Sequence, residues 1–171
     1  AVFFWSLASE GVVKNLTLKG GAQGVVTIIG GSLAGFLWGT VENCFVDVNV
    51  TSNHASQPCG GLVGTACGNY LIENTIYVGT ARCSNPEAAN GSGFIGSGSK
   101  NSVVNCFILE GSTEGVVGFG RLGDSVEPAT NCFKSEAELK TASTYEGWDT
   151  TVWNIVDGQM PALIKGCTKA E

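Results

Sequence analysis

Four carboxylate residues lie on predicted strands of this chain, where they could serve acid–base chemistry: Glu42, Asp47, Glu73 and Glu110. Hydrolysis of a glycosidic bond needs two carboxyl groups about 5 to 9.5 Å apart across the sugar. Glu42 and Glu73 each come directly before an asparagine of the repeat described below, so they would stack on neighbouring turns of the chain. The equivalent residue of the next repeat is Val104, which ends the row. We therefore interpret the row as a solvated surface rather than a catalytic pair.

Other groups that could act as nucleophile, base or metal ligand are sparse. The single histidine, His54, lies in a polar loop, and we interpret it as solvated rather than as a catalytic base. The four aspartates are spread over the chain and supply neither the acid cluster of a calcium site nor a lyase centre. No G-x-S-x-G motif, phosphate loop or paired C-x-x-C occurs. The sequence therefore predicts no catalytic residue, no metal site and no cofactor.

Composition limits the class of protein that could carry these residues. Glycine supplies 25 of the 171 residues, hydrophobic residues make up 43%, and charged residues only 14%. An average globular domain has roughly 25% charged residues. The net charge of −6 and the lack of a Lys/Arg cluster argue against nucleic-acid binding, and no apolar run approaches the roughly 20 residues that cross a bilayer. High glycine with many Val, Ile and Thr indicates a turn-rich all-β protein.

An asparagine that recurs at similar intervals marks an internal repeat. It precedes a short apolar strand in five places: Asn15, Asn43, Asn74, Asn105 and Asn131. Upstream of each asparagine lies an apolar pair between two glycines, at 61–64, 93–96 and 115–118, with Trp38 in place of the second glycine at 35–38 and both glycines replaced at 2–5. A unit of this length cannot bury its own apolar face and must stack on its neighbours. The repeat therefore predicts an all-β parallel β-helix, or β-solenoid, in which each unit is one coil.

Stacked coils place equivalent residues in columns along the solenoid. We expect the five asparagines to form a ladder of side-chain amides. Strand alternation points the following position inward, so Cys44, Cys106 and Cys132 are expected to be buried, reduced core residues. The next position faces outward as an apolar stripe that either contacts a partner or lies beneath a loop or the C-terminal helix: Phe45, Ile76, Phe107 and Phe133.

The pattern changes after Cys132. Ser135 and Glu138 form a capping box, which predicts a short helix that begins at Glu136 and ends near Ser143. The change of pattern divides the chain into repeats at 1–134 and a C-terminal cap at 135–171.

The second half of this cap is expected to be a strand at 152–156. Trp148 and Trp153 would then cover the open end of the solenoid, whose strand edges natural proteins protect. No similar cap precedes the first repeat, so we expect further coils upstream. The pairing of the other four cysteines is left open: Cys59, Cys67, Cys83 and Cys167.

The element Gly61-Leu62-Val63-Gly64, its variants and the Asn-Cys-Phe strand resemble the GLUG repeat, and the tail from Gly147 to Leu163 resembles the element that closes such arrays. This repeat is found in large bacterial cell-surface proteins, including some IgA-specific metallopeptidases. The resemblance implies an exported bacterial protein and a right-handed parallel β-helix, here of about five coils with a C-terminal cap. It supplies no active site, because the peptidases carry their zinc H-E-x-x-H helix in a separate domain. Trp5 and Trp38 depart from the repeat at its second glycine.

Two hypotheses about function follow. The first is a non-catalytic stalk or adhesin segment at the bacterial cell surface, which contacts a host or cell-surface protein, a glycan or a neighbouring domain through the apolar stripe. The alternative is a carbohydrate-active β-helix, a polysaccharide lyase or hydrolase, with part of its site in coils outside this chain. We expect the first, with an extracellular location, no enzymatic activity and no nucleic-acid partner.

Overall fold

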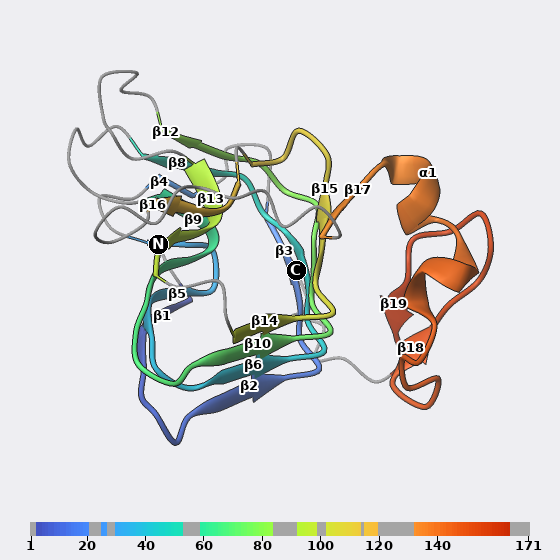
Figure 1. Cartoon of the computed structure of the whole chain (residues 1–171), viewed down its shortest axis with the longest axis horizontal. Coiled ribbons are helices and arrows are strands. Elements are labelled where there is room, and N and C mark those ends of the chain that lie inside the picture. Colours follow the sequence, from blue (N-terminus) through green and yellow to red (C-terminus); the bar gives the residue numbers. More distant parts are fainter. Residues whose placement is uncertain are drawn as a thin grey trace.

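The structure, a computed structural model, describes residues 3–20, 25–26, 30–52, 59–83, 92–98, 102–113, 115–119 and 132–164. Their regular structure consists of short strands in stacked sheets, with one short α-helix and one 3₁₀-helix near the C-terminal end (Figure 1). Two of the sheets form adjacent sides of each coil. Sheet A contains, in spatial order, β1 (Phe4–Leu7), β5 (Ala34–Leu37), β9 (Cys59–Ala66), β13 (Ser92–Ser97) and β16 (Gly115–Phe119). Sheet B contains β2 (Val12–Lys14), β6 (Thr40–Glu42), β10 (Leu71–Glu73) and β14 (Val103–Val104).

Two further sheets complete the coils. Sheet C contains β3 (Thr17–Lys19), β7 (Phe45–Asp47), β11 (Ile76–Tyr77), β15 (Phe107–Leu109) and β17 (Phe133–Lys134). Sheet D contains β4 (Val25–Val26), β8 (Val50–Ser52) and β12 (Ala81–Cys83). Successive strands of each sheet come from successive repeats, and all of these pairs are parallel. The prediction of an all-β chain built from stacked parallel strands is confirmed.

The corner between sheets B and C explains why asparagine recurs. Asn15, Asn43, Asn74 and Asn105 all have a left-handed backbone, with φ between 46° and 56°. Asparagine adopts this conformation more readily than other residues with a Cβ, because its short polar side chain bonds locally. The backbone N–H of Asn43 donates to the Glu73 carbonyl of the next coil at 3.2 Å, and Asn15 and Asn74 make the same bond to Glu42 and Val104 at 3.1 Å. The asparagine therefore turns the chain at the same point in each coil.

The interior of the coils is a continuous apolar core. As strand alternation predicts, Cys44, Val46, Cys106 and Ile108 point inward and are almost fully buried, and the Cys44 and Cys106 thiols are free. Cys132, a free thiol as well, is half-buried against the same cluster. Larger side chains from sheets A, B and C fill the rest of the interior: Leu33, Leu37, Val41, Leu62, Ile72, Tyr77, Phe94 and Ile95.

A column of glycines runs across sheet A. A Cβ at Gly64 would lie 2.6 Å from Cα of Gly30 and 2.8 Å from the carbonyl oxygen of Gly35, so a side chain there would displace the backbone of the neighbouring coil. Trp5 occupies the same column in β1, which is the edge strand of the sheet. The register places four glycines in this column: Gly35, Gly64, Gly96 and Gly118.

The register also corrects the frame of the second repeat. The sequence pattern places its apolar pair at 36–37, but Ala34 is in register with Val63, so the pair lies three residues earlier. The pattern misleads because Ser32 stands where the following repeats have their first glycine, and its backbone N–H donates to Gly61 at 3.0 Å. Trp38 therefore lies beyond the glycine column rather than in it.

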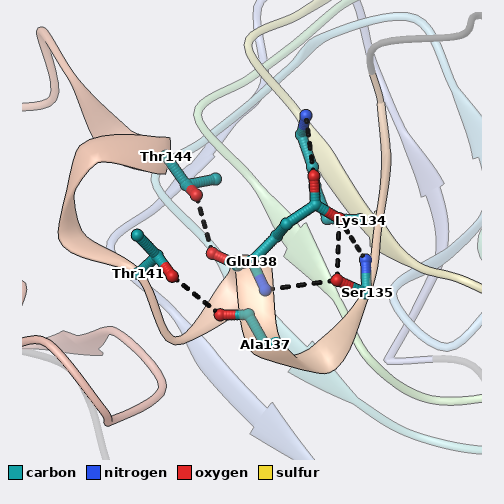
Figure 2. Close-up of polar contacts among 6 residues, drawn as sticks. All are labelled: Lys134, Ser135, Ala137, Glu138, Thr141 and Thr144. Carbon is teal, nitrogen blue, oxygen red and sulfur yellow. Dashed lines mark hydrogen bonds and ion pairs between the residues drawn. The ribbon is translucent and has the colours of Figure 1, made fainter.

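The segment after the repeats forms α1 (Glu136–Leu139), the 3₁₀-helix η2 (Ala142–Tyr145) and an antiparallel hairpin of β18 (Trp153–Asn154) and β19 (Ala162–Leu163). The capping box is confirmed: Ser135 Oγ accepts from the Glu138 N–H, and the Glu138 carboxylate accepts from the Ser135 N–H at 2.8 Å (Figure 2). The Ser135 hydroxyl also donates to the Glu138 carboxylate at 2.7 Å, and the bonds that the Ser135 hydroxyl and N–H donate hold the pKa of the Glu138 carboxyl below its usual value. The helix is shorter than expected, because Thr141 and Thr144 donate to its last carbonyls and compete with further turns.

The position of this segment corrects the expected end cap. Its helices and hairpin lie beside sheet C, to the right of the coils in Figure 1, and its aromatic residues contact side chains of β7, β11 and β15. The strand expected at 152–156 shortens to β18 and pairs with β19, not with an open edge of the solenoid. The segment thus crosses the side of several coils, because that side presents the apolar stripe.

Candidate functional site

The predicted apolar stripe on sheet C is covered from within the chain. Phe45 and Ile76 are 8% and 0% exposed, and both belong to a cluster with four residues of the C-terminal segment: Leu139, Tyr145, Trp148 and Trp153. The Phe107 ring stacks on Trp148 at a centroid distance of 5.6 Å and meets Tyr145 edge-on at 5.4 Å. Of the two alternatives for this stripe, the contacts favour the intramolecular one. Phe45, Ile76 and Phe107 are therefore not an open binding surface.

Phe133, the fourth member of the predicted stripe, lies on the other face of the sheet. It is in register with Ile108 rather than with Phe107, and it packs against the inner core. A shift of one residue moves every side chain of a strand to the opposite face. The prediction that Phe133 faces outward is therefore wrong, because the chain from Cys132 enters sheet C one residue out of the expected register.

The amides of the asparagine column make contacts other than those of a ladder. Asn43 Nδ2 donates to Glu42 Oε1 at 2.9 Å, and Asn43 Oδ1 accepts from Trp153 Nε1 at 3.3 Å. Asn15 Oδ1 is buried without a hydrogen-bond partner. No hydrogen bond joins two of these amides within the part of the chain that the structure describes, and Asn131 lies outside that part. The backbone geometry of the corner, rather than amide stacking, therefore accounts for the four described asparagines.

The position after three of the asparagines, Asn43, Asn74 and Asn105, holds a side chain that donates to the corner. Cys44 Sγ donates to the Glu42 carbonyl at 3.3 Å, Cys106 Sγ donates to the Val104 carbonyl at 3.3 Å, and Thr75 Oγ1 makes the same bond at 3.0 Å to Glu73. A thiol and a hydroxyl are thus interchangeable here because both supply a donor for the carbonyl two residues earlier. Burial raises the pKa of the Cys44 thiol to about 11 and also raises the pKa of the Cys106 thiol.

The acidic row of sheet B is where the sequence places it. Lys14, Glu42 and Glu73 are in register on neighbouring strands, and Val104 follows Glu73 in the same column. The Glu42 carboxylate is engaged by the Asn43 amide. No group of three or more His, Cys, Asp or Glu side chains that could hold a metal ion occurs in the described ranges, which do not include His54.

A cluster of exposed aromatic residues lies on β1, on β5 and at the residue directly after β5. Trp5 and Trp38 are 65% and 38% exposed, and the half-buried Phe36 lies between them. The Trp5 and Phe36 rings meet edge-on at a centroid distance of 5.7 Å, while the Phe36 and Trp38 rings stack at 5.8 Å with an angle of 24° between their planes. We call Trp5, Phe36 and Trp38 the open aromatic cluster.

Sequence reasoning did not identify the open aromatic cluster as a site, although a signal for it was present. Trp5 stands in the column that holds glycine in the other repeats, and a large aromatic residue in place of glycine on a strand requires free space outside the sheet. The sequence instead predicted the outward stripe on sheet C as the contact surface, because periodicity identifies an apolar face and does not say what covers it.

The described residues contain no helix that is long and apolar enough to cross a membrane. The chain matches no family model, no curated protein and no solved structure.

Proposed function

We propose that this chain is a non-catalytic stalk or adhesin segment of an exported bacterial surface protein, and that it contacts a glycan or protein partner through exposed aromatic side chains. The resemblance to the GLUG repeat supports the export and the surface location. The rigid stack of parallel strands supports a structural role, since each coil is hydrogen-bonded to the next along the axis.

The proposal includes a right-handed parallel β-helix of about five coils. Connections between parallel strands of one sheet are right-handed in about 98% of cases. Sheets A and C each contain five strands from successive repeats, which fits five coils.

The observation that carries the proposal is a difference between two apolar surfaces, of which one is covered by the chain and the other is exposed. The stripe on sheet C is closed by the C-terminal segment, while the open aromatic cluster on sheet A stays exposed. The C-terminal segment thus covers the apolar face of sheet C and does not cover the aromatic residues on sheet A. Exposed aromatic groups that are left uncovered mark contact sites more often than isolated apolar residues do.

A carbohydrate-active β-helix is the second candidate, because Glu42 and Glu73 are in register on adjacent strands. Two experiments separate the candidates. Binding of the chain to a glycan array tests the contact, and a reducing-end assay after incubation with polymeric polysaccharides tests cleavage. We expect binding without new reducing or unsaturated ends. Release of such ends, lost in Glu73→Gln, would replace the non-catalytic proposal with the enzymatic one.

A further inference from the structure

We propose that the open aromatic cluster is a stacking platform for a neutral glycan chain. This inference rests on the proposed non-catalytic binding function and assigns its site and ligand class. It replaces the stripe on sheet C, which the C-terminal segment covers.

The rings are held by the sheet beneath them. Ser6 of β1 is in register with Phe36 of β5, and the Trp38 backbone N–H donates to the Leu7 carbonyl at 2.9 Å. Phe36 contacts both tryptophan rings, so it restricts the rotamers of the two more exposed side chains. A platform fixed in this way loses little conformational entropy when a ligand binds, which favours affinity from a small contact.

Small residues surround the tryptophans and keep their faces accessible. The column that begins with Trp5 continues with Gly35, which carries no side chain beside the indole ring. Gly68 lies next to Trp38, since a Cβ there would be 3.5 Å from Cδ1 of that ring. The rings therefore stand above backbone rather than within a layer of side chains.

The chemistry of the surface fits a sugar ring. A pyranose presents an apolar C–H face, which stacks on an aromatic ring, and a rim of hydroxyl groups. The column of Phe36 continues with Ser6 on one side and Thr65 on the other, and Ser6 is exposed. These hydroxyl side chains can exchange hydrogen bonds with the rim. The net charge of −6 disfavours polyanionic ligands, so we assign a neutral glycan.

The three rings of the cluster alone offer less area than a protein interface buries. Three aromatic side chains bury about 450 to 750 Å² when they are fully covered, and these three are already partly covered by one another. A stable protein interface buries about 800 Å² on each partner. Two or three sugar units need far less area, because an aromatic face and a few hydroxyl groups suffice to orient them.

Tryptophan fluorescence titration of the full chain tests this site with defined probes. The neutral probes are hexasaccharides of β-1,4-linked glucose, N-acetylglucosamine and mannose, and the polyanionic probe is a heparin hexasaccharide. At least one neutral probe should bind, and Trp5→Ala and Trp38→Ala should each weaken that binding by about tenfold or more. The matched control is Val12→Ala, which removes a 57% exposed apolar residue from β2 of sheet B and should leave the affinity unchanged. Circular dichroism melting of every variant verifies folding.

The possible failures can be told apart. If a neutral probe binds the wild type and both tryptophan variants equally, the site lies elsewhere and the inference is overturned, although non-catalytic binding survives. If no neutral probe binds, or only the heparin fragment does, the ligand class is wrong and the inference is overturned as well. New reducing ends in the same samples would instead refute the proposed function, whichever residues bind the probe.

Discussion

The indole N–H of Trp153 donates a hydrogen bond of 3.3 Å to Oδ1 of Asn43, which lies 110 residues earlier in the chain. Asn43 thus has two roles. Its left-handed backbone turns the chain from sheet B to sheet C, and its amide fastens the C-terminal segment to the side of the coils. Trp153 is 1% exposed and its ring meets Trp148 at 4.9 Å, so this polar contact lies inside an aromatic cluster.

Substitutions at Asn74 should distinguish a backbone role from an amide role. Asn74 has φ of 46° and no amide contact that resembles that of Asn43. Asn74→Ala should destabilise the chain by about 1–2 kcal/mol, because alanine has a Cβ but no short polar side chain that bonds locally in the left-handed region. Asn74→Gly should be more stable than Asn74→Ala by about 1 kcal/mol, because glycine adopts this conformation freely. Urea denaturation measures the free energy of unfolding of both variants. Equal losses in the two variants would mean that the side-chain amide, as in the predicted ladder, stabilises this position.

Asn43 should respond differently from Asn74, because its amide has a partner in Trp153. Asn43→Gly keeps the turn but removes the acceptor of Trp153, so it should cost about 0.5–1.5 kcal/mol. Trp153→Phe removes the donor and retains most of the apolar contact. A double-mutant cycle between these two changes should give a coupling free energy of about 1 kcal/mol. Additive losses would mean that the hydrogen bond contributes nothing to the position of the C-terminal segment.

Gly64 should resist substitution because of the neighbouring coil. The Cβ of Gly64→Ala would lie 2.6 Å from backbone atoms of Gly30, and the sheet must shift to admit it. Overpacking of this kind costs about 1–3 kcal/mol. Thr51→Ala, on an exposed position of β8, is the control and should stay within about 0.5 kcal/mol of the wild type. A thermal melt of Gly64→Ala that matches the control would contradict the close stacking in sheet A.

The buried thiols should make stability depend on alkaline pH. Burial raises the pKa of Cys44 from an ordinary 9.0 to about 11 in the folded chain. Between these values the unfolded chain loses a proton that the folded chain retains, so the free energy of unfolding falls as pH rises from 9 to 11. It is unaffected by this thiol below pH 8. Cys44→Ala should reduce the slope in urea melts between pH 9 and 11, and an unchanged slope would mean that Cys44 is accessible in the native state.

Local patterns in the sequence were sufficient for the parts of the fold that repeat. The asparagine spacing predicted the stacking of coils, alternation predicted that Cys44 and Cys106 face inward, and the Ser135–Glu138 pair predicted the helix start. Each of these features depends on residues close together in the chain. The parallel sheets follow because only neighbouring repeats can bury such short strands.

Features that depend on contacts between distant segments could not be predicted in the same way. Phe133 is one residue out of the expected register, and nothing near it in the sequence sets that register. The stripe of Phe45 and Ile76 was identified as apolar, but its cover, Trp153, lies more than 70 residues away. Which apolar surface is closed and which stays open is decided by the path of the C-terminal segment, and periodicity carries no information about that path.

Oxidative footprinting of the four tryptophans in the native chain tests which of the two apolar surfaces is open to solvent. Trp5 and Trp38 are exposed. Trp148 and Trp153 are 7% and 1% exposed, because they pack between the rest of the C-terminal segment and sheet C. Brief exposure to hydroxyl radicals followed by peptide mass spectrometry should therefore label Trp5 and Trp38 and spare Trp148 and Trp153 until the chain is unfolded. Labelling of Trp148 and Trp153 in the native chain, with protection of Trp5 and Trp38, would show that the open surface lies on sheet C and would contradict the account.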